Sequence, residues 1–197
     1  MKMLHFKLYM LTLIFFGGIS CSEIKKNSAD YFPISVGMKL QYNIVQSKAD
    51  TNVEGKALMK IENTETINGK SYFIITYDYS GIPGLEPETY YTRLAEDGYY
   101  SMKKTNNVLS PEYLDVKLPL DAGTNWKSNS PEGEIEYTVQ GMENLELMNK
   151  KYENCLKLTF KSKEGEGGYM FLAKGIGIIK YYSKMNSGES IEFTLTD

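Results

Sequence analysis

The chain has 197 residues, of which 24% are charged, and a formal net charge of −3 at pH 7. Arg93 is the single arginine and basic residues form no cluster, so the chain lacks the positive surface that nucleic-acid binding requires. The single histidine, His5, lies in an N-terminal segment that we expect to be removed. The mature protein then holds no imidazole, which excludes Ser-His-Asp and Cys-His catalysis and zinc sites that use histidine.

Residues 1–20 have the pattern of an export signal. Lys2 and Lys7 form a basic region, and residues 8–20 are an uncharged run rich in Leu, Ile and Phe. A helix that spans a bilayer needs about 20 apolar residues, so this run is too short to remain as an anchor. It ends in Gly17-Gly18-Ile19-Ser20-Cys21, which resembles the lipobox of bacterial lipoproteins.

The lipobox resemblance implies that Cys21 receives a diacylglyceryl group and further acyl chains such as palmitate, and that the signal is cut before it. Gly18 departs from the lipobox, where a larger aliphatic residue is usual, and an ordinary signal peptide with an incidental cysteine is the alternative. In this family an Asp after the cysteine often signals inner-membrane retention. Ser22 stands there, so we expect anchoring in the outer membrane, on its periplasmic or its surface face.

The mature chain should consist of a tether and one domain. Residues 21–30 are short, polar and charged, as expected of a lipidated tether. Residues 31–197 suit a single domain that can bury a sizeable core. With 20 basic residues, after loss of Lys2 and Lys7, against 25 acidic ones, the mature charge is −5.

Within the domain, the sequence predicts β-strands almost throughout. Residues 40–44 alternate apolar and polar side chains, the pattern of a half-buried strand. Residues 55–66 and 70–79 are expected to form a hairpin across Asn68-Gly69, a dipeptide suited to a type I′ turn. A short helix is tolerable only at residues 110–115. Further strands are expected at residues 89–95, 99–103, 134–145, 152–161, 169–173, 177–182 and 190–195.

This pattern predicts a mainly β fold with little helix. Closely spaced strands without interleaved helices imply a curved antiparallel sheet, either half-barrel or sandwich-like. A weak repeat supports two related halves, residues 31–104 and 116–182, with chance similarity as the alternative. Its first match pairs Pro33-Ile34-x-x-Gly37-x-x-Leu40 with Pro119-Leu120-x-x-Gly123-x-x-Trp126.

Several blocks of the mature chain resemble a group of exported bacterial lipoproteins with no agreed activity. The blocks are Tyr31-Phe32-Pro33-Ile34-x-x-Gly37, Leu118-Pro119-Leu120-x-x-Gly123-x-x-Trp126, Tyr152-Glu153-Asn154-Cys155-Leu156 and Ala173-Lys174-Gly175-Ile176-Gly177. The resemblance implies a TapB-like or lipoprotein-carrier-like antiparallel β domain. It implies no activity, because one fold can carry many functions.

Three motifs could carry chemistry, and each has a plainer interpretation. Asp50-x-Asn52-x-Glu54-Gly55 resembles half of an EF-hand loop, but Ile61 stands where the bidentate Glu is needed, which favours a polar hairpin turn over calcium. Gly175-x-Gly177 lacks the third glycine of a dinucleotide loop and predicts a bulge. Cys155 has no basic neighbourhood that would lower its pKa, so we expect an inert thiol.

Acidic pairs also fall short of a catalytic signature. Glu86 with Glu88, or Glu96 with Asp97, could serve glycoside hydrolysis, but most acidic residues lie in expected turns and indicate a solvated surface. We therefore expect a protein that is not an enzyme and uses no cofactor or metal.

The abundance of tyrosine is the remaining feature, with 15 in the mature chain and three doublets. In a strand, a doublet places one ring on each face of the sheet. The plain interpretation is β propensity and rings at the core edge. The functional one is a groove for an apolar small molecule, lipid, glycan or peptide, which makes the protein a non-catalytic binder or carrier. The alternative is a structural or protein-interaction lipoprotein with a filled core. The expected groove residues are Tyr77, Tyr91, Tyr99, Trp126 and Tyr169.

Overall fold

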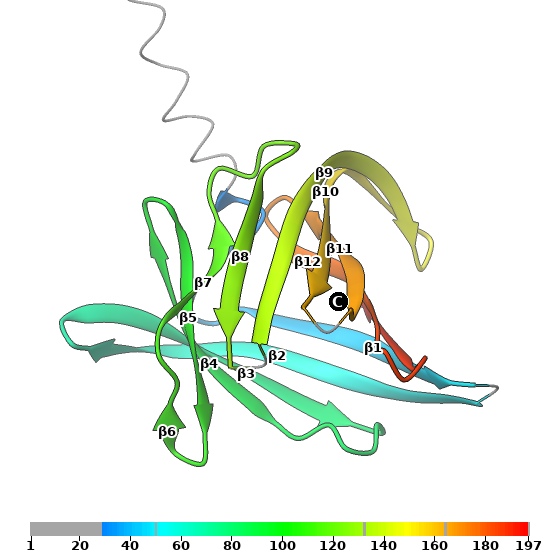
Figure 1. Ribbon diagram of the computed structural model, residues 1–197, viewed down its shortest axis with the longest axis horizontal. Helices are drawn as coiled ribbons and strands as arrows, with labels where there is room; N and C mark the ends of the chain where they lie inside the picture. Colours follow the sequence, from blue (N-terminus) through cyan, green and yellow to red (C-terminus); the bar gives the residue numbers. More distant parts are fainter. Residues whose placement is uncertain (1–28, 50, 132, 164, 197) are drawn as a thin grey trace, which may run out of the picture.

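A computed structural model describes residues 29–49, 51–131, 133–163 and 165–196 (Figure 1). The expected signal, Cys21 and most of the expected tether lie outside these residues. Within them, no helix is long and apolar enough to cross a membrane. The strands are β1 (Lys39–Lys48), β2 (Thr51–Ile67), β3 (Lys70–Ser80), β4 (Glu88–Ala95), β5 (Gly98–Thr105), β6 (Val108–Leu109), β7 (Tyr113–Lys117), β8 (Asn125–Ser130), β9 (Gly133–Leu147), β10 (Lys150–Ser162), β11 (Gly167–Ala173), β12 (Gly177–Lys184) and β13 (Ser190–Leu195).

All of these strands belong to one antiparallel sheet, in the order β6-β5-β4-β3-β2-β1-β13-β12-β11-β10-β9-β8, with β7 on β5. Each half is a meander of sequential hairpins, and the pairing of β1 with β13 joins the halves. The Asn68-Gly69 turn has φ values of 49° and 77°, and a type I′ turn needs positive values at both positions. The predicted mainly β fold with a curved antiparallel sheet is confirmed.

The sheet curls until its two ends lie side by side without closing into a barrel. The free edge of β5 pairs with β6 at one end and with β7 at the other. β7 lies next to β8, the last strand of the hydrogen-bonded path. The indole Nε1 of Trp126 donates to the backbone oxygen of Asp115 at 3.0 Å. A side chain therefore bridges this seam between β7 and β8.

The expectation of a short helix at residues 110–115 was wrong. Pro111 lies between strands, and residues from Tyr113 onward form β7, whose backbone pairs with β5. Tyr113 and Val116 are both buried there. The exposed edge of β5 offers backbone partners that an isolated helical turn would lack, because a single turn is costly to nucleate.

Buried side chains of β10 and β11 extend the main hydrophobic cluster into the second half. The long β9–β10 hairpin arches over this part of the molecule (Figure 1). Tyr152 and Cys155 of β10 belong to a buried cluster with Phe171 and Ala173 of β11. Cys155 is fully buried and burial raises the pKa of its thiol, an environment in which a thiolate is disfavoured.

The glycine turns that begin the two expected halves attach to the sheet in the same way. In each, the glycine amide donates to the carbonyl of a residue in the second strand after the turn. The amide of that residue donates back to the carbonyl of the residue after the glycine. The bonds are Gly37 N to Ile61 O (2.7 Å) and Ile61 N to Met38 O (3.0 Å), and Gly123 N to Val139 O (2.8 Å) and Val139 N to Thr124 O (2.9 Å). These matching bonds support the half-repeat, which stays a proposal.

Candidate ligand-binding site

The concave side of the sheet encloses a hollow with two connected chambers. The deep chamber has a volume of about 170 Å³ and the outer chamber about 450 Å³. Tyr42, Tyr77, Asp115, Tyr137 and Ile178 line both, so the chambers adjoin. The outer chamber has the size of a small-molecule site, for which about 300–1,000 Å³ is usual.

The N-terminal segment of the domain closes the deep chamber. Phe32, Pro33 and Ile34 line this chamber. The Tyr99 hydroxyl holds the segment by donating to the backbone oxygens of Ala29 (3.0 Å) and Phe32 (2.7 Å). Burial and the nearby Asp30 carboxylate raise the pKa of Tyr99 to about 12, so it stays a neutral donor at physiological pH.

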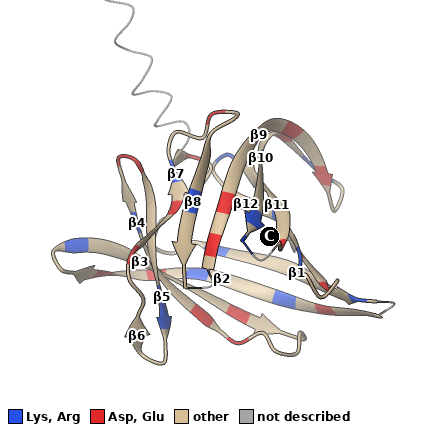
Figure 2. Cartoon of the chain, in the orientation of Figure 1, with Lys and Arg blue, Asp and Glu red and all other residues tan. Residues whose placement is uncertain are grey.

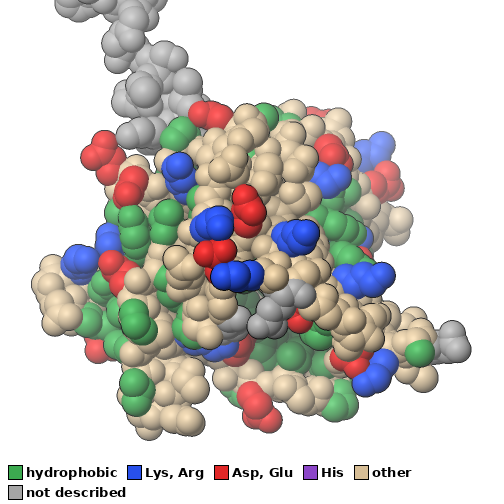
Figure 3. All heavy atoms as spheres, in the orientation of Figure 1, with side chains coloured by type: hydrophobic (Ala, Val, Ile, Leu, Met, Phe, Trp, Pro, Cys, Tyr) green, Lys and Arg blue, Asp and Glu red, His purple; other side chains and the backbone are tan. Residues whose placement is uncertain are grey.

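The outer chamber opens at the opposite end of the sheet. Leu85 from the β3–β4 connection, Ser130 at the end of β8 and Met185 after β12 line it. In Figure 1 these connections lie at the lower end of the strands, and the N-terminal segment lies at the upper end. Figure 3 shows hydrophobic side chains within a recess near the centre of the view, bordered by charged side chains of both signs.

An aromatic belt runs along the inner wall from β8 to β4. The centroids of successive rings lie 5.0–6.4 Å apart, within the range in which aromatic pairs attract. All of its rings except Phe160 line one chamber or the other. The successive pairs are Trp126–Tyr137 (5.0 Å), Tyr137–Phe160 (5.9 Å), Phe160–Tyr181 (5.4 Å), Tyr181–Phe193 (5.7 Å), Phe193–Tyr79 (6.4 Å), Tyr79–Tyr77 (6.4 Å) and Tyr77–Tyr90 (6.1 Å).

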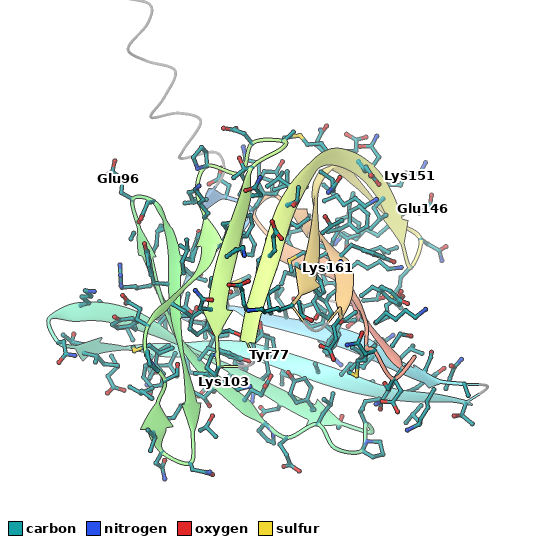
Figure 4. All side chains as sticks on the ribbon, viewed as in Figure 1. Tyr77, Glu96, Lys103, Glu146, Lys151 and Lys161 are labelled. Atoms are coloured by element: carbon teal, nitrogen blue, oxygen red, sulfur yellow. The ribbon has the colours of Figure 1, made fainter. Side chains whose placement is uncertain are left out.

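A polar strip occupies the wall beside the seam, on β4, β5 and β7. The hydroxyls of Thr92 and Ser101 lie 2.9 Å apart, and Ser101 donates to Oδ2 of Asp115 at 3.0 Å. Nearer the opening, Nζ of Lys103 donates to Oε1 of Glu88 at 2.5 Å. Figure 4 labels Lys103 and Tyr77. The hollow is thus amphipathic, with one aromatic and aliphatic wall and one polar wall.

Buried phenols beside the carboxylates keep their protons. Burial, followed by the charges of Asp115 and Glu88, raises the pKa of Tyr77 well above its usual value. Burial and the Glu88 carboxylate do the same to the pKa of Tyr79, whose hydroxyl donates to Glu88 Oε2 at 2.9 Å. At physiological pH these tyrosines therefore offer neutral rings and hydroxyl donors.

Three of the five expected groove residues line the hollow. Tyr77, Tyr99 and Trp126 do so, although the hydroxyl of Tyr99 is engaged by the N-terminal segment. Tyr91 packs on the outer face in a cluster with Tyr72 and Met102, and does not line either chamber. A role of these residues in binding stays a prediction.

Tyr169 also lies away from the two chambers. Its ring stacks on Tyr182 at 5.3 Å and meets Phe171 edge-on at 5.6 Å. The neighbouring Met170 lines the deep chamber instead, as strict alternation along β11 requires. Cys21, the expected lipidation site, lies outside the described residues.

Sequence reasoning missed several residues of the hollow, among them Tyr42, Glu88, Tyr90, Tyr137 and Phe193. The Tyr90-Tyr91 doublet was a usable signal, because one member of a doublet in a strand must face the concave side. Which member does so depends on strand pairing, and register shifts such as those in the β2–β3 and β11–β12 pairs change that assignment along a strand.

Comparison with known proteins shows a likeness of fold. No family model matches the chain, and no curated protein matches it. A candidate exported protein with a YmcC-like fold from Bacteroides fragilis NCTC 9343 superposes with a TM-score of 0.50 at 10% identity, over 83% of this chain and 95% of that one. At this identity the likeness concerns the fold alone.

Two further solved structures are more distant. A candidate lipoprotein from Parabacteroides distasonis ATCC 8503 gives a TM-score of 0.45 at 10% identity, over 84% of this chain and 96% of that one. A LolA superfamily protein from Nitrosomonas europaea gives 0.35 at 11% identity, over 91% and 92%. The likeness of fold thus rests on the first of the three, the protein with the YmcC-like fold.

Proposed function

We propose that the protein is a cell-envelope lipoprotein that binds an apolar ligand within its curved sheet and catalyses no reaction. The connected hollow is the observation that carries this proposal. Its outer chamber of about 450 Å³ is lined mainly by aromatic and aliphatic side chains with a few placed polar groups. That combination is typical of small-molecule binding sites.

The envelope location rests on the N-terminal sequence. The lipobox-like end at Cys21 and the short apolar run before it support export and lipidation, and Ser22 favours the outer membrane. The similarly folded Bacteroides fragilis protein is named as a candidate exported protein, which agrees with this assignment. Cys21→Ser should leave unmodified precursor in membrane fractions. Intact-mass analysis of wild type that finds a chain starting at residue 21 without acyl mass would contradict the proposal.

Ligand binding can be tested by blocking the hollow where its chambers meet. Ile178 lines both chambers, so Ile178→Trp places a bulky ring in the passage between them. We expect at least tenfold weaker binding of N-phenyl-1-naphthylamine, an apolar dye whose fluorescence rises on burial. Ile74→Trp is the matched control, because Ile74 is half-buried in the cluster on the outer face.

Native mass spectrometry of protein purified from its own envelope is the second measurement. We expect a co-purifying small molecule in wild type and less of it in Ile178→Trp. If wild type binds neither the dye nor an endogenous molecule, the hollow is not a ligand site. The structural or protein-interaction role considered from the sequence would then be favoured.

A further inference from the structure

The segment of residues 29–34, which we call the strap, joins the two halves of the sheet at the closed end of the hollow. Hydrogen bonds fasten it to β5 in the first half, and to β10 and the β11–β12 turn in the second half. These bonds are Tyr99 Oη to Ala29 O (3.0 Å) and to Phe32 O (2.7 Å), Gly175 N to Asp30 O (2.8 Å) and Tyr31 Oη to Asn154 O (3.1 Å). The strap is therefore held in place from both sides.

The side chains of the strap form the end wall of the deep chamber. Phe32, Pro33 and Ile34 line this chamber and not the outer one. The ring of Phe32 packs on that of Tyr99, with 5.6 Å between their centroids. Ile34 packs against both of the larger hydrophobic clusters. Moving this wall outward would break these contacts together with the hydrogen bonds that hold the backbone of the strap.

The deep chamber is small and apolar. It is lined largely by aliphatic and thioether side chains, among them Met38, Leu40 and Met170. An apolar cavity of about 150 Å³ can hold benzene, which has six carbon atoms. At about 170 Å³, the deep chamber therefore has room for about six carbon atoms of a ligand. Because it continues into the larger outer chamber, a ligand that fills both must end in a narrow apolar part.

We propose that the ligand ends in one unbranched hydrocarbon chain, that this chain enters the deep chamber, and that the strap limits its length. This inference rests on the proposed function and names the ligand class and the segment that selects within it. Each methylene group that leaves water for the chamber should raise the affinity about fourfold. A chain that already reaches Phe32 and Ile34 gains nothing from another methylene, because the added group must stay outside or displace the strap.

The length limit can be tested with n-alkyl maltosides from hexyl to hexadecyl. They share one uncharged head, so only the chain differs. Each is titrated below its micelle concentration against full-length mature protein preloaded with N-phenyl-1-naphthylamine. We expect the affinity to rise with chain length and then to stop rising within the series. A continuous rise through hexadecyl, or failure of every maltoside to displace bound dye, would overturn the inference and leave apolar binding intact. A protein that binds neither dye nor maltoside would overturn the proposed function itself.

A bulkier end wall should shorten the limit. Ile34→Trp fills part of the deep chamber, so the affinity should stop rising at least two carbons earlier than in wild type. Hexyl maltoside, whose short chain need not reach the wall, should bind within twofold of wild type. Val36→Trp is the matched control, because Val36 follows the strap closely, is 55% exposed and lines neither chamber.

A looser strap should have the opposite effect. Tyr99→Phe keeps the ring but removes the donor to Ala29 and Phe32, so maltosides longer than the wild-type limit should bind at least fourfold more tightly than to wild type. Tyr100→Phe is the control, because the Tyr100 hydroxyl bonds to Asp97 away from both chambers. Tyr99→Phe also keeps the inference testable if Ile34→Trp does not fold. A limit at the same chain length in every folded strap variant would overturn the role of the strap.

Discussion

The inner and outer faces of β4 use the same residue type in opposite ways. Tyr90 faces the hollow, where its ring contributes to the aromatic belt. Tyr91, the next residue, is 6% exposed on the outer face and packs against Tyr72 and Met102. Other side chains of the protein pack against the outer face, whereas the inner face borders the hollow. The comparison teaches that strand alternation alone places one of two adjacent tyrosines in a packed cluster and the other on the wall of the hollow.

The two faces also differ in how they use charge. On the outer face, Glu112 accepts from Nε and Nη2 of Arg93 at 2.6 and 2.8 Å, and from the Tyr72 hydroxyl at 2.5 Å. This bidentate pair fastens the segment before β7 onto β3 and β4. The inner face places the Glu88–Lys103 pair at an opening instead. Figure 2 shows that charges of both signs are otherwise spread over the strands and their connections.

Truncation of the outer-face ring should have the largest effect on stability. Tyr91→Ala removes a buried ring with neighbours on all sides, so we expect a loss of about 3 kcal/mol in the free energy of unfolding. Urea denaturation measures this loss. Dye affinity under conditions where the variant is folded should stay within twofold of wild type. A stable variant with impaired dye binding would show that Tyr91 faces the ligand.

Truncation of the inner-face ring of Tyr77 should weaken dye binding more, and lower the free energy of unfolding less, than truncation of Tyr91. Tyr77→Ala should weaken dye binding about tenfold, which corresponds to about 1.4 kcal/mol. Its cost in unfolding free energy should be roughly half that of Tyr91→Ala, because one side of the ring faces empty space and lacks packing partners. Fluorescence titration and urea denaturation on the same samples test the ranking. Tyr77→Phe keeps the ring and serves as the control, and a loss of affinity in that variant would assign the effect to the hydroxyl.

Acid should weaken the Arg93–Glu112 ion pair on the outer face within a defined pH range. The Arg93 guanidinium holds the pKa of Glu112 at about 2, below its ordinary value of 4.5. Because the pKa of Glu112 is lower in the folded state, its ionised carboxylate stabilises the fold fully above about pH 4.5. This contribution disappears as the pH falls from 4.5 towards 2. Glu112→Gln should therefore cost about 1 kcal/mol at pH 7, a modest value because water screens this partly exposed pair. The cost should vanish near pH 2, and a pH-independent difference in unfolding free energy would contradict this account.

A similarly small effect on stability is expected under the β9–β10 hairpin. Cys155→Ala removes one buried sulfur atom, so we expect a loss of about 1 kcal/mol and unchanged dye affinity. In wild type, 5,5′-dithiobis(2-nitrobenzoate) should label Cys155 slowly in the native state and rapidly after denaturation, because the thiol is buried and its pKa is raised. Fast native labelling would show that the hairpin opens and exposes this layer.

Local sequence determined most of the strands and turns. Alternation predicted β1, and Asn68-Gly69 predicted the hairpin between β2 and β3. Strands were also expected at the positions of β4, β5 and β9 to β13, but not at β8. These features depend on residues close together in the chain, whose side-chain periods and φ preferences are readable without the fold. The richness in tyrosine likewise predicted aromatic walls, although it did not predict which rings would face inward.

Tertiary structure alone decided the seam, the hollow and its polarity. β7 and β8 are short, and they lie side by side only because the sheet curls until its ends meet. Glu88 and Lys103 approach through the register of β4 with β5, and Tyr90 rather than Tyr91 faces inward through that same pairing. Register shifts add single residues to strands and thereby change which side chains face the core. The cumulative effect of twist, bulges and long-range pairing therefore determines which side chains line the hollow, because no single stretch of sequence contains both partners of these contacts.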